Sequence, residues 1–191
     1  MSPEPKALIS EVEGFVLERY ASNVLPPAEI VEIGSWAGTS AERLCAGSKR
    51  GAGAHVTCID TWADWVDPPE DQWPATGADA LRVFLDRVDP VVVMPLRAPS
   101  LVVAPMWLRE IGLLFIDAGH TYEQCLADYE AWSRFVLPGG VLAIHDYLRE
   151  PDPALWWCEG PSRVVEEVVE PSGRWEHEET VGWTWVGRRR S

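Results

Sequence analysis

Two segments, Gly112-Leu-Leu-Phe-Ile-Asp-Ala-Gly-His-Thr-Tyr122 and Leu137-Pro-Gly-Gly-Val-Leu-Ala-Ile-His-Asp-Tyr147, decide the fold of this chain. Each contains a short, nearly continuous apolar run, which is typical of a strand buried on both faces of a parallel sheet. The residues between them carry apolar side chains at helical spacing, and Pro138-Gly139-Gly140 is expected to end that helix and turn the chain. The two segments therefore predict one strand–helix–strand unit.

Titratable side chains follow both predicted strands. Asp117 and His120 come after the first strand, and His145 and Asp146 come directly after the second. In an open α/β sheet, ligands bind outside the carboxyl ends of the strands. These four side chains are therefore candidates for chemistry.

The rest of the chain continues the alternation of strands and helices. Further strands are predicted over 29–33, 55–59 and 91–96, with helices over 6–22, from Thr39 to Cys45, 78–88, 101–109 and 162–170. The helix over 6–22 is predicted from an apolar stripe formed by Leu8, Ile9, Val12, Phe15, Val16 and Tyr20. Segments 174–181 and 183–188 predict a closing hairpin with a tight turn near Gly182. The expected fold is one α/β domain over 1–191 with seven strands, mostly parallel, ending in an antiparallel hairpin.

Composition limits the partners. The formal net charge is −14, so the field of the protein would repel nucleic acid and anionic membranes. No apolar run approaches membrane-spanning length, and the first residues lack the pattern of a signal peptide. The four cysteines, Cys45, Cys58, Cys125 and Cys158, show no metal-ligand spacing and are expected to be reduced thiols of a cytoplasmic protein.

A glycine-containing turn follows the strand over 29–33. From Glu32 onward the spacing is E-x-G-x-x-x-G, which differs from the dinucleotide-binding pattern G-x-G-x-x-G. It also differs from a phosphate-binding loop, because no lysine follows Gly38. Such a turn lets a ligand approach the backbone, although glycine is also used merely to turn the chain. Asp60 ends the next strand, where it could accept hydrogen bonds from a ribose or cap the following turn.

Taken together, four motifs resemble a known family. E-I-G-S-W-A-G-T-S (32–40), C-I-D-T-W (58–62), I-D-A-G-H-T-Y (116–122) and P-G-G-V-L-A-I-H-D-Y (138–147) occur in this order. The order is similar to that of class I S-adenosylmethionine-dependent methyltransferases, which have a Rossmann-like, doubly wound sheet. Within that class, the chain resembles small-molecule and sugar O-methyltransferases, whose signature is I-D-G-x-H-x-Y, then P-G-G, then an H-D or E-D pair.

The resemblance implies a set of residues that bind S-adenosylmethionine. Glu32, Gly34, Ser35 and Gly38 would line its methionine part, Asp60 would hold the ribose, Thr61 and Trp62 would border the cofactor, and Asp117 would lie beside it. Ser100 would contact the adenine region. Pro99 stands where an acid is common in the family, which makes adenine recognition less well defined.

The resemblance also implies a role for each of the four titratable side chains. His120 would be the general base, and Asp117, His145 and Asp146 would hold Mg²⁺ or another divalent metal. His145 departs from the oxygen ligands that Mg²⁺ prefers, which leaves a transition metal, or no metal, open. As alternatives, His120 could cap the helix that begins near Thr121, and the other three groups could shape the pocket without metal.

Two Trp- and Pro-rich segments, 61–76 and 148–161, are predicted substrate loops. Their tryptophans could form a flat wall for a hydroxylated small molecule or pack beneath the loops, and exposed tryptophans would also suit a homodimer. The leading interpretation is an O-methyltransferase. Two alternatives are a cofactor-binding protein without turnover and a metal-dependent hydrolase, which would leave the glycine turn and Asp60 without a purpose.

Overall fold

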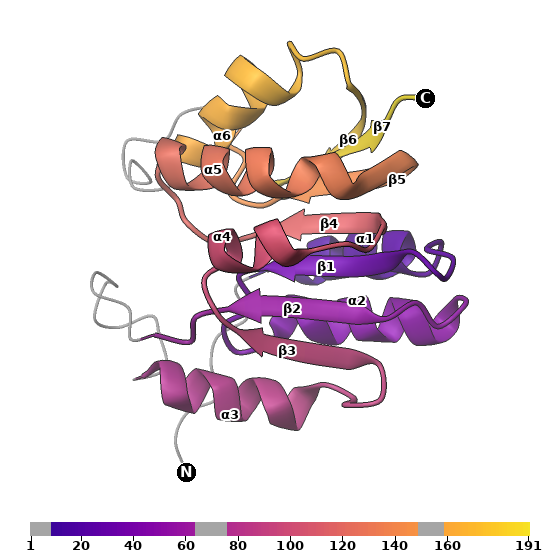
Figure 1. Ribbon diagram of the computed structural model, residues 1–191, viewed down its shortest axis with the longest axis vertical. Helices are drawn as coiled ribbons and strands as arrows, with labels where there is room; N and C mark the ends of the chain where they lie inside the picture. The colour runs from indigo at the N-terminus through magenta and orange to yellow at the C-terminus, as the bar shows by residue number, and fades with distance from the viewer. Residues whose placement is uncertain (1–8, 64–75, 149–158) are drawn as a thin grey trace.

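The computed structural model describes residues 9–63, 76–148 and 159–191 (Figure 1). Most of each predicted substrate loop, including Trp65, Trp73, Trp156 and Trp157, lies outside the described residues, as does Cys158. The three described cysteines, Cys45, Cys58 and Cys125, are free thiols and are buried, as expected.

One seven-stranded sheet contains all the described strands. Their bounds are β1 Glu29–Ile33, β2 Val56–Asp60, β3 Val93–Arg97, β4 Ile111–Ile116, β5 Val136–Ile144, β6 Trp175–Val181 and β7 Thr184–Arg189. The order across the sheet is β3-β2-β1-β4-β5-β7-β6. The first five strands pair in parallel, and β7 pairs antiparallel with both β5 and β6. The predicted Rossmann-like sheet with a C-terminal hairpin is confirmed.

Helices cover both faces of the sheet. Their bounds are α1 Glu11–Ala21, α2 Thr39–Arg50, α3 Gly77–Arg87, α4 Ser100–Val103, α5 Tyr122–Trp132 and α6 Glu159–Val164, with a π-helical turn η4 at Val165–Val169 and short 3-10 turns η1 at Ala104–Met106 and η2 at Ser133–Phe135. Figure 1 shows α1 and α2 behind the strands and α5 in front of them. Each face has its own apolar core, one built with α1, α2 and α3 and the other with α5, α6 and η4.

Hydrogen bonds between neighbouring strands continue past their carboxyl ends. The amide of Asp117 donates to Ile33 O at 2.8 Å, and the amide of His145 donates to Ile116 O at 3.0 Å. The residues that follow β1, β4 and β5 therefore lie at one edge of the sheet.

The prediction that Pro138-Gly139-Gly140 ends the helix before β5 is wrong. Helix α5 already ends at Trp132, and the Pro-Gly-Gly residues lie inside β5. The register against β4 shifts here, because Ile111 pairs with Val136 whereas Leu113 pairs with Val141. Proline lacks an amide to donate and Gly139 has φ 79°, so the segment forms an irregular opening to the strand.

Two predicted helices also differ in detail. The expected helix over 101–109 is shorter, because α4 ends at Val103 and passes into the 3-10 turn that contains Pro105. Of the apolar stripe predicted for the first helix, Ile9, Val16 and Tyr20 are buried, whereas Val12 and Phe15 are 56% and 54% exposed, so the stripe is confirmed only in part. Among the described residues, no helix is long and apolar enough to cross a membrane.

Candidate active site at the carboxyl edge of the sheet

The glycine turn after β1 packs directly against the end of β4. Gly34 has φ +85°, and a Cβ added to it would lie 2.0 Å from the carbonyl oxygen of Asp117. Gly38, the N-cap of α2, has φ +82°, and its Cβ would lie 2.9 Å from Phe84 Cδ2. Contacts inside the protein therefore require glycine at both positions. Because glycine has no side chain, the backbone of the turn is also not covered at these two residues.

Glu32 is a fully buried acid beneath this turn. Its Oε2 accepts a hydrogen bond of 2.5 Å from Ser35 Oγ, whereas Oε1 is buried without a hydrogen-bond partner among the described residues. Burial raises the pKa of Glu32 to about 7, although the hydrogen bond from Ser35 opposes the shift. Glu32 therefore has one buried oxygen available to a donor.

Asp60 ties the glycine turn to the loop after β2. Its carboxylate accepts backbone hydrogen bonds from Ser35 N at 2.8 Å, Trp36 N at 2.9 Å and Trp62 N at 2.7 Å. Asp60 therefore acts as a cap, one of the two roles that its position predicted. Oδ2 accepts two of these bonds and Oδ1 accepts one, so Oδ1 has a further lone pair that can accept from a ribose hydroxyl.

The two residues after Asp60 differ in exposure. Thr61 is exposed, whereas the ring of Trp62 is 1% exposed, donates from Nε1 to Trp36 O at 2.8 Å and packs edge-on against Phe84. The indole of Trp62 is therefore a core side chain.

Ser100, predicted to contact adenine, begins α4. Its hydroxyl donates to the carboxylate of Asp128 on α5. Asp128 is 6% exposed, and burial raises its pKa, although the hydrogen bond from Ser100 opposes the shift. The structure thus brings an acid that the sequence analysis did not single out next to Ser100.

His120 and Asp146 meet across the ends of β4 and β5. His120 Nε2 lies 3.0 Å from Asp146 Oδ2, and Asp146 has a positive φ of 57°. The cap of α5 is Thr121, whose hydroxyl accepts from Gln124 N at 3.2 Å in a capping box. The side chain that caps α5 is therefore Thr121, and His120 is directed to Asp146.

His145 lies among three carboxylates. Its Nδ1 is 3.2 Å from Asp117 Oδ1 and 3.5 Å from Asp146 Oδ1, while its Nε2 is 3.3 Å from Glu13 Oε1. Glu13 belongs to α1, is 4% exposed and was not among the predicted site residues. One sequence signal could have indicated it, because Ser10-Glu-Val-Glu13 has the spacing of a capping box.

The charged groups of this cluster shift the pKa values of His145 and Asp146 toward their charged forms. Burial alone would lower the pKa of His145, but the neighbouring carboxylates, Asp117 first among them, raise it well above its ordinary value. Burial alone would raise the pKa of Asp146, but hydrogen bonds from His120 and His145 outweigh it and lower the pKa. The neighbouring carboxylates therefore favour the protonated form of the buried His145 imidazole.

One group of described residues has the geometry to hold a metal ion. A ligand atom from each of Asp117, His120 and Asp146 lies within 4.8 Å of the other two. The predicted set contained His145 in place of His120, but both ring nitrogens of His145 face carboxylates. One imidazole with two carboxylates suits a divalent transition metal better than Mg²⁺.

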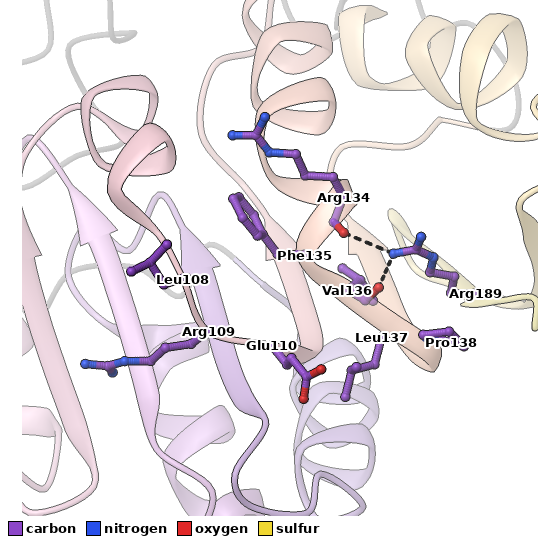
Figure 2. A pocket seen from close by; sticks show the side chains of 9 residues that line it. All are labelled: Leu108, Arg109, Glu110, Arg134, Phe135, Val136, Leu137, Pro138 and Arg189. Atoms are coloured by element: carbon purple, nitrogen blue, oxygen red, sulfur yellow. Dashed lines mark hydrogen bonds between the residues drawn. The ribbon is translucent and has the colours of Figure 1, made fainter.

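A hollow of about 320 Å³ lies at the opposite edge of the sheet (Figure 2). It is lined by the residues before β4, the start of β5 and Arg189, which donates from Nη1 to Arg134 O and Val136 O. The hollow is therefore separate from the groups at the carboxyl edge.

Comparison with known proteins gives the family. Residues 31–147, more than half of the chain, match the family described as "Methyltransferase domain". The chain belongs to this methyltransferase family.

Solved structures with this fold include several methyltransferases. An O-methyltransferase from Bacillus cereus in complex with SAH is 21% identical, with a TM-score of 0.61, and the match covers 97% of this chain and 84% of that one. A putative O-methyltransferase from Klebsiella pneumoniae is 17% identical, with a TM-score of 0.70 and coverage of 98% and 84%. CalS11, a TDP-rhamnose 3'-O-methyltransferase of calicheamicin biosynthesis, is 16% identical, with a TM-score of 0.63 and coverage of 93% and 77%.

Proposed function

We propose that this protein is an S-adenosylmethionine-dependent methyltransferase that methylates a hydroxyl group of a small molecule. Family membership supports methyl transfer, and fold neighbours named as O-methyltransferases favour oxygen as the acceptor atom. The observation that carries the proposal is the His120–Asp146 pair, which lies at the edge where the glycine turn meets the end of β4.

The residues beneath the glycine turn suit the predicted cofactor. Gly34 and Gly38 leave the backbone bare, and the buried Oε1 of Glu32 has no described partner. An oxygen of this kind can accept from the ammonium of the methionine part, directly or through water. Oδ1 of Asp60 accepts only one hydrogen bond inside the protein and retains a lone pair for a ribose hydroxyl.

The chemistry needed from the protein is modest. S-adenosylmethionine supplies an electrophilic methyl group on a sulfonium, so the carbon–sulfur bond breaks without help from an acid. The acceptor oxygen forms the new bond to the methyl carbon, and its proton passes to His120. Asp146, whose Oδ2 lies 3.0 Å from His120 Nε2, would orient the imidazole and stabilise the imidazolium that results.

A divalent ion is the second part of the proposal. Asp117, His120 and Asp146 would hold it, and its charge would lower the pKa of the acceptor hydroxyl. His120 would then have two possible roles, as a metal ligand or as the base. A chelator separates them, because the enzyme keeps its activity if His120 acts as a base without metal and loses it if the reaction needs the ion.

The test is calorimetric titration of S-adenosylmethionine, followed by transfer of labelled methyl to a panel of sugars, sugar nucleotides and phenols. We expect binding and at least one methylated product whose methyl group is on oxygen. Absence of cofactor binding would refute the proposal as a whole. Binding without any product would favour a cofactor-binding protein that does not turn over.

A further inference from the structure

Glu13 is a buried carboxylate that the reaction described above does not use. Both of its oxygens are held inside the protein. Oε2 accepts from Ser10 N at 2.7 Å, and Oε1 accepts from Trp183 N at 2.8 Å and from Thr184 Oγ1 at 3.2 Å. Glu13 thereby joins the start of α1 to the β6–β7 hairpin.

The same Oε1 also faces the candidate active site. His145 Nε2 lies 3.3 Å from it, and the opposite ring nitrogen, Nδ1, lies 3.2 Å from Asp117 Oδ1 and 3.5 Å from Asp146 Oδ1. The imidazole of His145 is 5% exposed. A continuous row of contacts therefore runs from α1 through His145 to the two aspartates.

We propose that Glu13 is a positioning residue for methyl transfer, which acts through His145 to fix the carboxylates of Asp117 and Asp146. The inference rests on the proposed function above. With carboxylates on both sides, the buried imidazole has one favourable orientation. Without Glu13 it would keep partners on one side only, and its ring could tilt away from the aspartates.

The competing explanation is that Glu13 only stabilises α1 and the hairpin. Ser10→Ala separates the two roles, because it removes the hydroxyl that bonds to Oε2 and leaves the contacts of Oε1 unchanged. Glu18→Gln is a matched control, since Glu18 is also a buried acid of α1, but its partners are Arg43 and Arg50.

The experiment measures kcat and KM with labelled S-adenosylmethionine and the best acceptor of the panel, under conditions where melting curves show every variant to be folded. We expect Glu13→Gln to lower kcat about tenfold or more, with the cofactor dissociation constant unchanged within about twofold. Ser10→Ala and Glu18→Gln should keep kcat within about twofold of the wild type.

A double-mutant cycle tests whether the effect passes through His145. We expect His145→Gln to lower kcat by a similar factor, and the combination with Glu13→Gln to add little further loss. Nitrogen-15 NMR gives a readout without turnover, in which Glu13→Gln shifts the His145 Nε2 resonance and Ser10→Ala does not.

The outcomes separate this inference from the proposed function. If the wild type transfers methyl and Glu13→Gln is as fast, or if Ser10→Ala causes an equal loss, the positioning role is refuted and the function stands. Fully multiplicative losses in the cycle also refute it. If the wild type binds cofactor but methylates nothing, the proposed function fails and the inference fails with it.

Discussion

Gly34 is the residue at which the turn and the end of β4 come closest. We predict that Gly34→Ala destabilises the protein by more than about 2 kcal/mol, since a positive φ alone costs an alanine about 1–2 kcal/mol and the new Cβ must also displace the backbone of Asp117. Chemical denaturation measures the loss. The matched control is Gly53→Ala, because Gly53 has φ +75° and open space around its Cβ. Equal losses in both variants would contradict the contact argument.

Glu32 should make stability depend on pH. Its pKa rises from an ordinary 4.5 to about 7 in the folded protein, so the folded state favours the protonated acid. The stabilisation is complete below pH 4.5 and is lost as the pH rises through about 7. Glu32→Gln, which stays neutral, should therefore gain stability relative to the wild type between about pH 5 and about pH 8. Urea unfolding of the cofactor-free protein measures the difference, and a pH-independent difference would argue against it.

Part of the site could be predicted from single residues. Asp117, His120 and Asp146 follow strand ends, so their sequence positions place them at one edge, and the structure brings their ligand atoms within 4.8 Å. Glu13 could not be predicted in this way, because it comes from another element and an isolated acid in a helix is usually exposed. Its proximity to His145 depends on how α1 packs.

At the scale of elements, strands were predicted better than the details of helices. β1 was predicted at its observed bounds, because its apolar run is continuous and a glycine turn follows it. In α1, Val12 and Phe15 are exposed while Glu13 and Leu17 are buried. Hydrophobicity alone favours Val12 and Phe15, whereas the hydrogen bonds that satisfy Glu13 arise only in the folded protein.

The Pro-Gly-Gly segment shows a second limit. These residues are typical of a turn, yet β5 continues through them. β5 pairs with β4 on either side of the segment, at Val136 and Val141, and Arg188 Nη1 donates to Gly139 O at 2.7 Å. Such long-range contacts override local preference. They cannot be read from a short window of sequence.

Helix α5 offers a test at this scale. Thr121 caps it with a side-chain bond to Gln124 N, and the next residue towards the N-terminus is His120. We predict that Thr121→Ala lowers the free energy of unfolding by about 1 kcal/mol. The same substitution should lower kcat by a larger factor than it changes the cofactor dissociation constant, because the cap helps to fix the backbone next to His120. Denaturation and steady-state kinetics measure the two effects, and an unchanged kcat would show that the cap does not support His120.

At the scale of the whole molecule, the net charge of −14 is the dominant feature. Repulsion among like charges opposes the compact state, and salt screens it. We predict that raising NaCl from about 0.02 M to about 0.5 M increases the melting temperature. A thermal melt at each concentration measures it, and a decrease on adding salt would contradict the repulsion argument.

The predicted homodimer is a property of the whole molecule. A homodimer was expected from exposed tryptophans, and Trp183 is 42% exposed in the described part of the chain. Leu108, Met106 and Val102 are also exposed, near η1. Sedimentation velocity with the wild type gives the oligomeric state directly, and a single monomeric species would refute the prediction of a dimer.

The most direct test of the account is the rate of methyl transfer from labelled S-adenosylmethionine by the wild type and by His120→Ala. His55→Ala is the matched control, since His55 is an exposed histidine before β2. We predict that the wild type and His55→Ala form methylated product at equal rates, and that His120→Ala is slower by about 100-fold or more while binding the cofactor equally well. Equal rates in all three proteins, or no transfer by the wild type, would contradict the account.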